Sequence, residues 1–418
     1  MATQSKTFCP LPFMHSHHSV AGKYKPCCNS DSPGHKGNVY TSRQLSLEEW
    51  FDSEPMQQLR KDLLSGVQNP VCDVCWKQEE TGGRSYRQSM IERLQREQGF
   101  EPSFIKKPKI TYLDLKFSNE CNFACRMCDY TNSHQIKKDM DALDDLGLPN
   151  PIHWDRSPTQ ESLWDPQTGI FSSINLDQVL SLLPDLRILK VTGGEPMISK
   201  PFLRVLDEAI DNGYAKNIIL HVTTNASKFN DKVMNKILQF KKIYFTVSCD
   251  GYGSTYDYIR YPYSWSLFEK RIIGFLEQHH NNFDHVRLSF SLVPQMYNIE
   301  NIDKFLKWAN DLDKKYYGDK KMLTAHVQTH LYPLDSDLQF HNMPIDLLKQ
   351  CYDNIANELD QADASFLNLL EHKIKNHKDP TEEKLKLIKQ TTKNIDKVRK
   401  QNYQNFLEPR TIGWLNQI

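Results

Sequence analysis

The sequence predicts an α/β protein: a partial (β/α)6, TIM-like barrel with a small domain at the N-terminus and a helical C-terminal tail. Two observations lead to this fold. Strand-like and helix-like segments alternate through the middle of the 418-residue chain, and eight of its ten cysteines lie within the first 128 residues. We therefore expect three regions, at residues 1–104, 105–335 and 336–418. Repeated βα units imply a parallel sheet, and such sheets bind ligands at the carboxyl ends of their strands.

The middle region carries six expected strands, each a short run rich in apolar and β-branched residues. In the first strand, Leu113 and Leu115 lie on one face while Asp114 and Lys116 lie on the other, which is the alternation of a half-buried strand. The six expected strands are residues 110–117, 187–192, 217–224, 242–249, 285–293 and 323–331. Helical segments are expected between them, for example at 201–211, 264–278 and 299–312.

Both flanking regions are expected to contain helices. The N-terminal region has one clear helix, which begins at the capping box from Ser46 to Glu49 and runs toward Gly66. The tail is charged but keeps an apolar periodicity, for example at Leu385 and Ile388. Its lysine-rich stretch, 373–400, is interspersed with acids, which indicates a solvated helix face rather than an RNA-binding surface.

Composition excludes some classes of protein. The 52 basic and 52 acidic residues cancel, so overall charge does not direct this chain to nucleic acid or to a membrane surface. No apolar run reaches the ~18 residues of a membrane-spanning helix. Residues 1–18 hold no apolar segment typical of a signal peptide, so we expect a cytoplasmic protein whose thiols stay reduced.

Three cysteines follow the first expected strand directly. Cys121, Cys125 and Cys128 have the spacing C-x3-C-x2-C, which lets one short loop present three thiolates. Thiolates are soft ligands that suit an iron–sulfur cluster, and a four-iron cluster held by three of them keeps one iron open for a small molecule. The alternatives are a zinc site completed by a distant ligand and a set of buried, inert thiols.

This motif at the end of a first βα strand resembles the signature of the radical SAM superfamily. The resemblance implies that the three cysteines hold a [4Fe–4S] cluster whose fourth iron binds S-adenosylmethionine (SAM). Reductive cleavage of SAM then gives a 5′-deoxyadenosyl radical that abstracts a hydrogen atom from the substrate. One residue departs from the pattern, because Met127 stands where the family often has an aromatic side chain.

Further segments resemble the SAM-binding parts of this family. Gly193, Gly194 and Glu195 follow the second expected strand, and Thr224-Asn225 ends the third. Ser248 ends the fourth strand in the sequence Ser-Cys-Asp-Gly, and Arg260 lies twelve residues after it. The resemblance implies that Arg260 pairs with the SAM carboxylate, for which a bidentate guanidinium contact is suited. An ordinary turn and a surface ion pair are the alternatives for Ser248 and Arg260. The cofactor-binding residues implied are Gly193, Gly194, Glu195, Asn225, Ser248 and Arg260.

The N-terminal region offers a second set of thiols. Cys9 and Cys27, with Gly22 between them, precede the pair Cys72 and Cys75. Four such residues suit either zinc or an iron–sulfur cluster, and the residues alone leave that choice open. Cys28 is an alternative to Cys27.

This second pattern resembles the SPASM or twitch auxiliary domain, here placed before the barrel. Residues 47–87, with Glu79, Gly82, Ser85 and Arg87 after the cysteine pair, resemble a subgroup with that order of domains. The resemblance implies a second, auxiliary [4Fe–4S] cluster. A redox-active pair at Cys72 and Cys75 is the remaining alternative.

Two smaller features are expected to be structural. His15, His17 and His18 suggest a metal site, but surface or packing roles are favoured. Cys249, at a strand end, could donate a hydrogen atom to a radical, but a small buried side chain is favoured.

The sequence as a whole indicates a radical SAM enzyme. Its substrate is expected to be a peptide or protein, or a small molecule, and a flavodoxin- or ferredoxin-like protein is expected to supply the electron. Membrane and nucleic-acid partners are not expected. The alternatives are a zinc-binding adaptor for nucleic acid or protein, without catalysis, and an iron–sulfur electron carrier.

Overall fold

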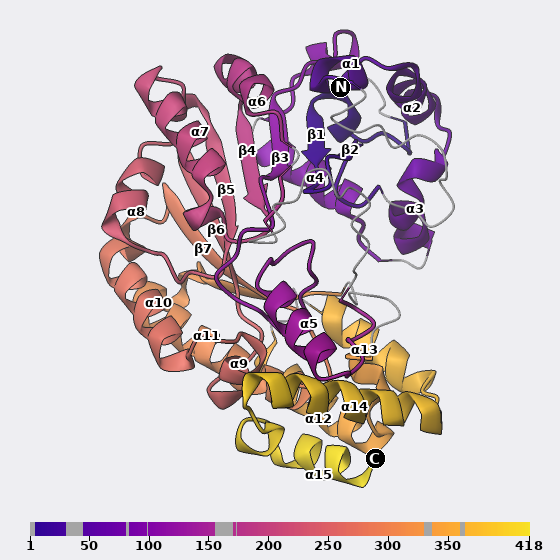
Figure 1. Ribbon diagram of the computed structural model, residues 1–418. Coiled ribbons are helices and arrows are strands. Elements are labelled where there is room, and N and C mark those ends of the chain that lie inside the picture. Colours follow the sequence, from indigo (N-terminus) through magenta and orange to yellow (C-terminus); the bar gives the residue numbers. More distant parts are fainter. Residues whose placement is uncertain are drawn as a thin grey trace.

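One sheet of eight strands organises the chain (Figure 1). The computed structural model describes residues 5–30, 45–80, 83–97, 99–154, 170–172, 174–329, 337–359 and 364–418. The strand order is β2-β1-β3-β4-β5-β6-β7-β8, and every neighbouring pair is parallel except β1 with β2. The strands are β1 (His15–His18), β2 (Tyr24–Lys25), β3 (Tyr112–Lys116), β4 (Ile188–Thr192), β5 (Ile219–Thr224), β6 (Lys242–Ser248), β7 (Val286–Leu292) and β8 (Thr324–Val327).

Strands β3 to β8 are the six that the sequence predicts, and helices connect them into a (β/α)6 unit. Because β2 and β8 are the two ends of this strand order, the sheet is an open, partial barrel among the described residues. The predicted fold class is thus confirmed. The connecting helices are α5 (Ile136–Asp145), α6 (Leu176–Leu182), α7 (Lys200–Asp211), α8 (Asp231–Ile237), α9 (Ser254–Ile259), α10 (Trp265–His279) and α11 (Ile302–Tyr317).

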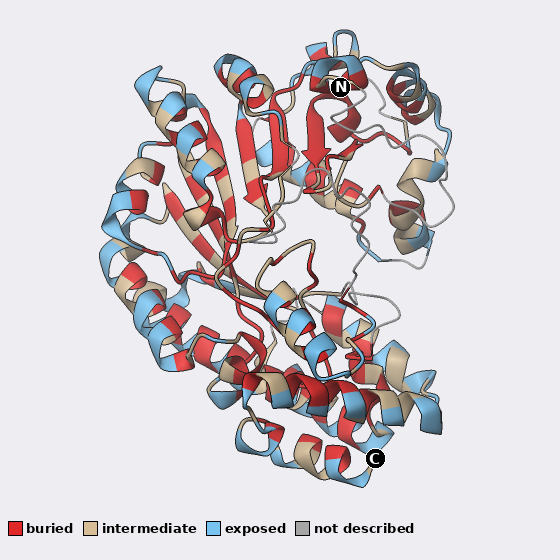
Figure 2. Ribbon diagram, in the orientation of Figure 1, coloured by how far each residue is buried: buried red, intermediate tan, exposed pale blue. Residues whose placement is uncertain are grey.

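The two faces of the sheet differ in chemistry. One face carries apolar side chains such as Leu189, Leu220 and Phe245, which are almost fully buried and pack against the helices. Figures 1 and 2 show α7, α8 and α10 along that side, with their blue, exposed faces turned to solvent. The other face carries a polar row, because registered pairing places these residues side by side across neighbouring strands: His17, Asp114, Lys190, His221, Tyr244 and Arg287.

Strands β1 and β2 are an addition that the sequence did not reveal. The segment His15–His18 has no apolar alternation, yet it pairs in parallel with β3 and is buried. The three histidines therefore pack inside the protein rather than lie on its surface. The sheet extends across the predicted boundary at residue 104, and the three predicted regions remain predictions. Their boundary at 335 and 336 touches residues outside the described part.

The N-terminal helix differs from its prediction. Ser46 caps a helix through a complete capping box with Glu49, as predicted, but that helix, α1 (Leu47–Phe51), ends after five residues. A second helix, α2 (Glu54–Ser65), follows Ser53, which is its N-cap residue. Gly66, in the left-handed conformation, ends it. Pro55 explains the break, because proline in the first turn starts a helix and cannot continue one. Two further helices follow, α3 (Asp73–Glu80) and α4 (Tyr86–Arg96).

The tail is helical, as predicted, and consists of α12 (Ile345–Glu358), α13 (Ser365–Lys375), α14 (Glu382–Arg399) and α15 (Pro409–Gln417). Only one side of α14 is solvated. Its other side buries Ile388, Ile395, Asp396 and Arg399. Figure 1 shows α14 lying beside α5, and Arg399 binds Asp139 of α5 with an Nη2–Oδ2 distance of 2.6 Å.

The apolar face of the sheet should dominate stability. Replacing fully buried Leu189 with alanine should lower the free energy of unfolding by about 2–5 kcal/mol, because it removes packed methyl groups and leaves a cavity. Leu267→Ala is the control, since Leu267 is 51% exposed, and it should change stability by less than about 0.5 kcal/mol. Denaturant titration followed by circular dichroism measures both. Equal losses in the two variants would contradict this account of the core.

Candidate active site

A cavity of about 230 Å³ lies where β3, β4, β5 and β6 end. It is formed by the loop after β3, the two glycines after β4 and the ends of β5 and β6. Eight of the nine residues predicted for the catalytic cluster and for SAM line this one cavity: Cys121, Cys125, Cys128, Gly193, Gly194, Asn225, Ser248 and Arg260. Parallel strands bring these separate motifs together because all their carboxyl ends lie at the same edge.

The loop that carries the three cysteines, here called the cysteine loop (117–135), is held by main-chain hydrogen bonds. The Cys128 N–H donates to Cys125 O at 3.0 Å, which closes a turn between two of the thiols. The N–H groups of Ala124 and Arg126 donate to Tyr261 O and Ile259 O at 2.8 and 2.9 Å. The residues on either side of Arg260 thus fix the position of the cysteine loop.

Arg126, inside the cysteine motif, anchors the loop from behind. It is fully buried, and its guanidinium binds Asp396 Oδ1 at 2.5 Å and Gln401 Oε1 at 2.9 Å. Its Nε donates to Tyr258 O, and the guanidinium carbon lies 3.5 Å from the centre of the Tyr258 ring. Asp396 and Gln401 belong to the tail, so the tail helps to build the cysteine loop. The sequence gives no signal for this contact, because its partners are 270 residues apart.

The three thiols are close enough to influence one another electrostatically. Burial, and to a smaller extent the nearby Cys125, raises the pKa of Cys121 to about 12. Burial also raises the pKa of Cys128, with Asp129, Cys125 and Cys121 adding to the effect. Three neighbouring thiolates are therefore unfavourable unless a positive charge compensates them, and bound metal supplies that charge. The thiol set fits an iron–sulfur cluster.

The glycine pair after β4 is required by close packing. Gly193 and Gly194 both have positive φ angles, of 74° and 52°. A Cβ atom on Gly194 would overlap the carbonyl oxygen of Glu120, the residue before Cys121. The Glu195 N–H donates to that same oxygen at 2.7 Å. Only glycine lets this turn lie directly against the cysteine loop.

Glu195 is the predicted SAM-binding residue that does not line the cavity. It is 1% exposed, and its carboxylate accepts hydrogen bonds from the Thr224 hydroxyl and the Asn225 N–H, both at 2.7 Å. The carboxylate therefore joins the end of β4 to the end of β5. Asn225 in turn donates through Nδ2 to Asn122 Oδ1 of the cysteine loop at 3.0 Å.

Arg260 is buried at the cavity and has donor capacity left. The Nη2 atom of Arg260 lies 2.6 Å from Asp250 Oδ2. The other oxygen of this carboxylate, Oδ1, accepts a hydrogen bond from the Val293 N–H at 2.7 Å. The Nε atom of Arg260 is buried and makes no hydrogen bond within the part of the chain that the structure describes. A buried N–H group that belongs to a cation and has no hydrogen-bond partner is suited to an anionic ligand group, such as a carboxylate. Cys249 Sγ lies 3.3 Å from Gly251 O and is fully buried, as favoured.

The N-terminal thiols also come together. Burial raises the pKa of Cys27, and Cys28, Cys72, Cys9 and Cys75 all raise it further. Burial raises the pKa of Cys9 to about 12, with Cys75 adding to it. Gly22, at φ 76°, closes the turn between β1 and β2 and so returns Cys27 toward Cys9.

Cys28 faces a different environment from Cys27. Its electrostatic neighbours include Tyr86, Tyr112 and Lys190, which belong to the polar side of the sheet and to α4. Cys27 has Cys72, Cys9 and Cys75 among its electrostatic neighbours, and Tyr86 is a neighbour of both Cys27 and Cys28.

A buried network supports the Cys72 and Cys75 pair. Arg87 pairs with Glu79 at 2.5 Å, and Ser85 donates to Glu79 Oε1 at 2.5 Å. Burial raises the pKa of Cys75, and the Arg87 N–H opposes this by hydrogen bonding to the sulfur. Such N–H contacts to sulfur are typical of thiolates that bind metal. Gly82, of the same predicted pattern, lies outside the described residues.

Among the described residues, no group of three or more His, Cys, Asp or Glu side chains is arranged around a single metal ion. A four-iron cluster differs from a single ion because each thiolate binds a different iron atom, so its ligands lie farther apart.

The polar row on the sheet contains a buried group of charged side chains. Lys190 Nζ binds Asp114 Oδ2 at 2.9 Å, and His17 Nδ1 lies 3.4 Å from the same oxygen. Burial raises the pKa of Asp114, but Lys190 and His17 outweigh it and hold that pKa well below its usual range. Tyr112 Oη and His15 Nε2 are buried and make no hydrogen bond within the described ranges. Sequence alternation marked Asp114 as facing away from the apolar core but gave no hint of its partners.

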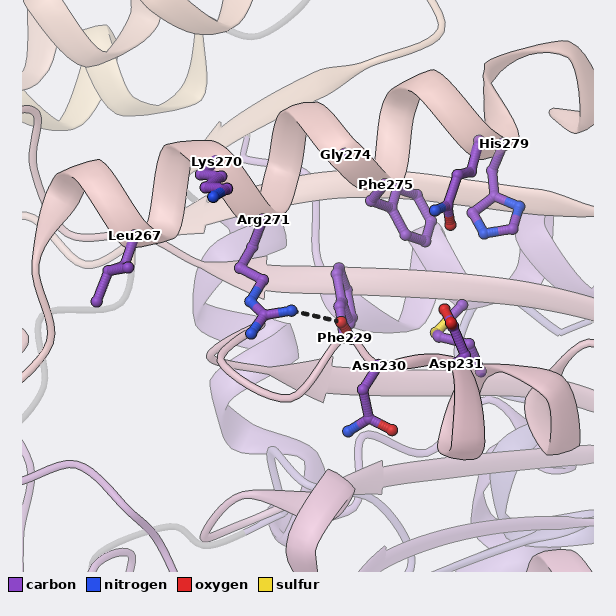
Figure 3. Close-up of a pocket in the computed structure, with 11 residues that line it drawn as sticks. Phe229, Asn230, Asp231, Leu267, Lys270, Arg271, Gly274, Phe275 and His279 are labelled. Atoms are coloured by element: carbon purple, nitrogen blue, oxygen red, sulfur yellow. Dashed lines mark hydrogen bonds between the residues drawn. The ribbon is translucent and has the colours of Figure 1, made fainter.

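A further hollow, of about 430 Å³, lies between α8 and α10 on the helical side of the sheet (Figure 3). Arg271 crosses it to donate to Phe229 O at 3.3 Å. None of the predicted site residues lines it.

Comparison with known proteins gives a likeness of fold. No family model matches the chain. No curated protein matches it either. Three solved structures that it resembles are native anSMEcpe with bound AdoMet (16% identity, 57% of each chain covered, TM-score 0.34), Streptococcus suis SuiB bound to the precursor peptide SuiA (12%, 69% of this chain and 58% of that one, 0.36) and SuiB bound to S-adenosylmethionine (11%, 72% and 60%, 0.31).

The chain thus spans 57–60% of the length of these three structures. The names of these structures state what those proteins bind: AdoMet for anSMEcpe, and S-adenosylmethionine or the precursor peptide SuiA for SuiB. The TM-scores all lie below 0.5, so we base the functional proposal on the residues of this chain. No helix among the described residues is long and apolar enough to cross a membrane.

The close packing at Gly194 can be tested directly. Gly194→Ala should displace the cysteine loop and lower the free energy of unfolding by about 2–4 kcal/mol, through strain at positive φ plus the overlap with Glu120. Gly213→Ala is a matched control, because Gly213 has φ 73° but open space around it, and should lose only about 1 kcal/mol. Denaturant titration measures the stabilities, and alkylation of Cys121 measures the displacement. Equal behaviour of the two variants would contradict this packing.

Proposed function

We propose that this chain is a radical SAM enzyme that reductively cleaves S-adenosylmethionine and uses the resulting 5′-deoxyadenosyl radical to modify a peptide or protein. One observation carries the proposal. Three thiols and five residues of three further motifs, all predicted for one cofactor system, line a single cavity at the carboxyl edge of a parallel sheet.

Cys121, Cys125 and Cys128 are the proposed ligands of a [4Fe–4S] cluster. When bound, that cluster would supply the electron for SAM cleavage and an open iron for SAM to bind. The protein's part is to place the three thiols, and it does so with main-chain hydrogen bonds from the cysteine loop to the segment around Arg260.

The cavity offers a complementary contact for each end of SAM. We assign the SAM carboxylate to Arg260, because its buried Nε is an unused donor beside Asp250. We assign the amino group to the turn at Gly193 and Gly194, where the backbone borders the cavity without side chains. Ser248 and Asn225 are the proposed polar contacts at the ends of β6 and β5.

Cys9, Cys27, Cys72 and Cys75 are the proposed ligands of a second, auxiliary [4Fe–4S] cluster. Their mutual electrostatic influence and the N–H contact from Arg87 to Cys75 support this. An auxiliary cluster at this place would border the polar side of the sheet through Cys28 and Tyr86.

The polar row on one face of the sheet supports a polar substrate. Buried Tyr112 Oη, His15 Nε2 and Asp114 Oδ1 have no hydrogen-bond partner among the described residues, and buried polar atoms are seldom left without one. A peptide backbone offers donors and acceptors at every residue, so a peptide or protein is the substrate class we propose. We place the reaction in the cytoplasm, with a flavodoxin- or ferredoxin-like protein as electron donor.

Anaerobic reconstitution tests the function as a whole. The protein is loaded with iron and sulfide, its metal content is counted, and dithionite and SAM are added. We expect about eight iron atoms per chain and formation of 5′-deoxyadenosine. Tightly bound zinc with intact SAM would instead support the zinc-binding adaptor.

The cysteine loop is tested by Cys125→Ala. This variant should form no 5′-deoxyadenosine above the background without protein, because two remaining thiolates cannot hold the catalytic cluster. Cys351→Ala is the control, since Cys351 is buried in α12, outside both thiol sets, and its activity should match that of the unaltered protein. Chromatography of the nucleoside product reads out both variants. Cleavage by Cys125→Ala would disprove the assignment.

The auxiliary site is tested by replacing Cys72 and Cys75 with alanine together. Iron content should fall from about eight to about four atoms per chain, while the first cluster stays detectable by its electron paramagnetic resonance signal. Cys28→Ala should keep about eight, because Cys27 is the proposed ligand of that pair. An unchanged iron content in the double variant would remove the auxiliary cluster from the proposal.

A further inference from the structure

Helix α14 forms a basic hollow on the surface of the tail. The hollow has a volume of about 510 Å³. Three lysines spaced four residues apart, and therefore on one side of the helix, contribute to it: Lys389, Lys393 and Lys397. The rest of its wall is polar and comes from α14, α15 and the segment between them: Asp396, Gln401, Asn402, Tyr403, Gln404 and Asn416. We call this surface the α14 basic hollow.

Two of the three lysines carry charge that no ion pair with a described residue neutralises, whereas the Lys389 ammonium donates a hydrogen bond to Ile418 O. Lys393 and Lys397 are exposed, and neither forms an ion pair with a described residue. By contrast, Lys386, which lies earlier on the same helix, forms an ion pair with Glu382. The single acid in the wall, Asp396, is already engaged by Arg126 and by the Tyr403 N–H. The helix dipole does not compensate the positive charge of Lys393, because its favourable effect on cations is confined to the last turn of the helix.

The floor of the hollow touches the cysteine loop. Asp396 Oδ1 and Gln401 Oε1, both in its wall, bind the guanidinium of Arg126 at 2.5 and 2.9 Å. Arg126 stands between Cys125 and Cys128 in the cysteine motif. One layer of hydrogen-bonded side chains therefore separates this basic surface from the proposed catalytic cluster.

We propose that the α14 basic hollow is the docking surface for an acidic flavodoxin, a carrier protein that delivers one electron from a reduced flavin. The inference rests on the proposed function, which needs an electron at the cysteine loop. Charge complementarity favours an acidic partner, since unneutralised lysines attract and orient it. In the transfer, the donor flavin is oxidised by one electron and the cluster bound by the cysteine loop is reduced by one. No bond or proton needs to move.

Charge reversal tests the docking surface. The variant Lys393→Glu/Lys397→Glu should bind a purified acidic flavodoxin at least about tenfold more weakly than the unaltered chain at low salt. The difference should shrink as salt rises, because salt screens exposed charges. Titration calorimetry on the reconstituted protein measures this binding without turnover. The second variant, Lys393→Gln/Lys397→Gln, should show a smaller loss in the same direction.

The control carries the same change of charge elsewhere. Lys216 and Lys241 are both exposed and lie at the opposite ends of the strands, before β5 and β6. Lys216→Glu/Lys241→Glu should bind the flavodoxin as the unaltered chain does. Equal weakening in both reversal variants would show that net charge alone acts, and would overturn the proposal. So would unchanged binding by Lys393→Glu/Lys397→Glu.

Two further readouts distinguish electron delivery from a loss of activity and from RNA binding. With dithionite, a small reductant that needs no docking, Lys393→Glu/Lys397→Glu should form 5′-deoxyadenosine at the unaltered rate, but flavodoxin-driven formation should fall at least about fivefold. A chain without dithionite-driven cleavage would refute the proposed function, whatever its flavodoxin affinity. Loss of binding to a mixed-sequence RNA with unchanged flavodoxin affinity would identify the hollow as a nucleic-acid site and overturn the proposal.

Discussion

Parallel pairing in a fixed register is the constraint on which the candidate site depends. Lys116 lies beside Thr192, Thr224 beside Val247 and Ser248 beside Ser291, so the strands end in step along one edge. The cysteine loop, the glycine pair, Asn225 and Ser248 meet there although more than a hundred residues separate the first from the last. A slip of one residue in any pair would turn the polar row toward the helices and the apolar side chains toward the cavity.

Much of this arrangement could be read from the sequence, because it depends on local patterns. Apolar runs mark the six central strands, cysteine spacing marks the three thiols of the cavity, and the resemblance to the radical SAM superfamily marks its other predicted residues. The strand at His15–His18 escaped notice because its burial comes from polar partners, such as Asp114 for His17, and not from apolar alternation. The break between α1 and α2 was signalled by Pro55, but the strong capping box before it suggested one continuous helix.

Contacts between distant parts of the chain could not be predicted in this way. Glu195 resembles a ligand-binding residue in sequence, yet its carboxylate ties β4 to β5 through Thr224 and Asn225. Nothing local in the sequence connects Arg126 to Asp396. In both cases a charge is buried inside the protein, and burial is tolerable only because hydrogen-bond partners surround it. These internal charges hold the edges of the cavity, while Arg260 keeps donor capacity for a ligand.

The bond between Arg126 and Asp396 also has a consequence for how the protein is made. A ribosome adds Arg126 270 residues before it adds Asp396, whose carboxylate anchors the Arg126 guanidinium. During that interval the thiols of the nascent loop lack the support of the tail, and such long-range contacts form late in folding because the intervening chain must first be ordered. The cysteine loop therefore reaches its final position only after translation, when the last helices have folded against it.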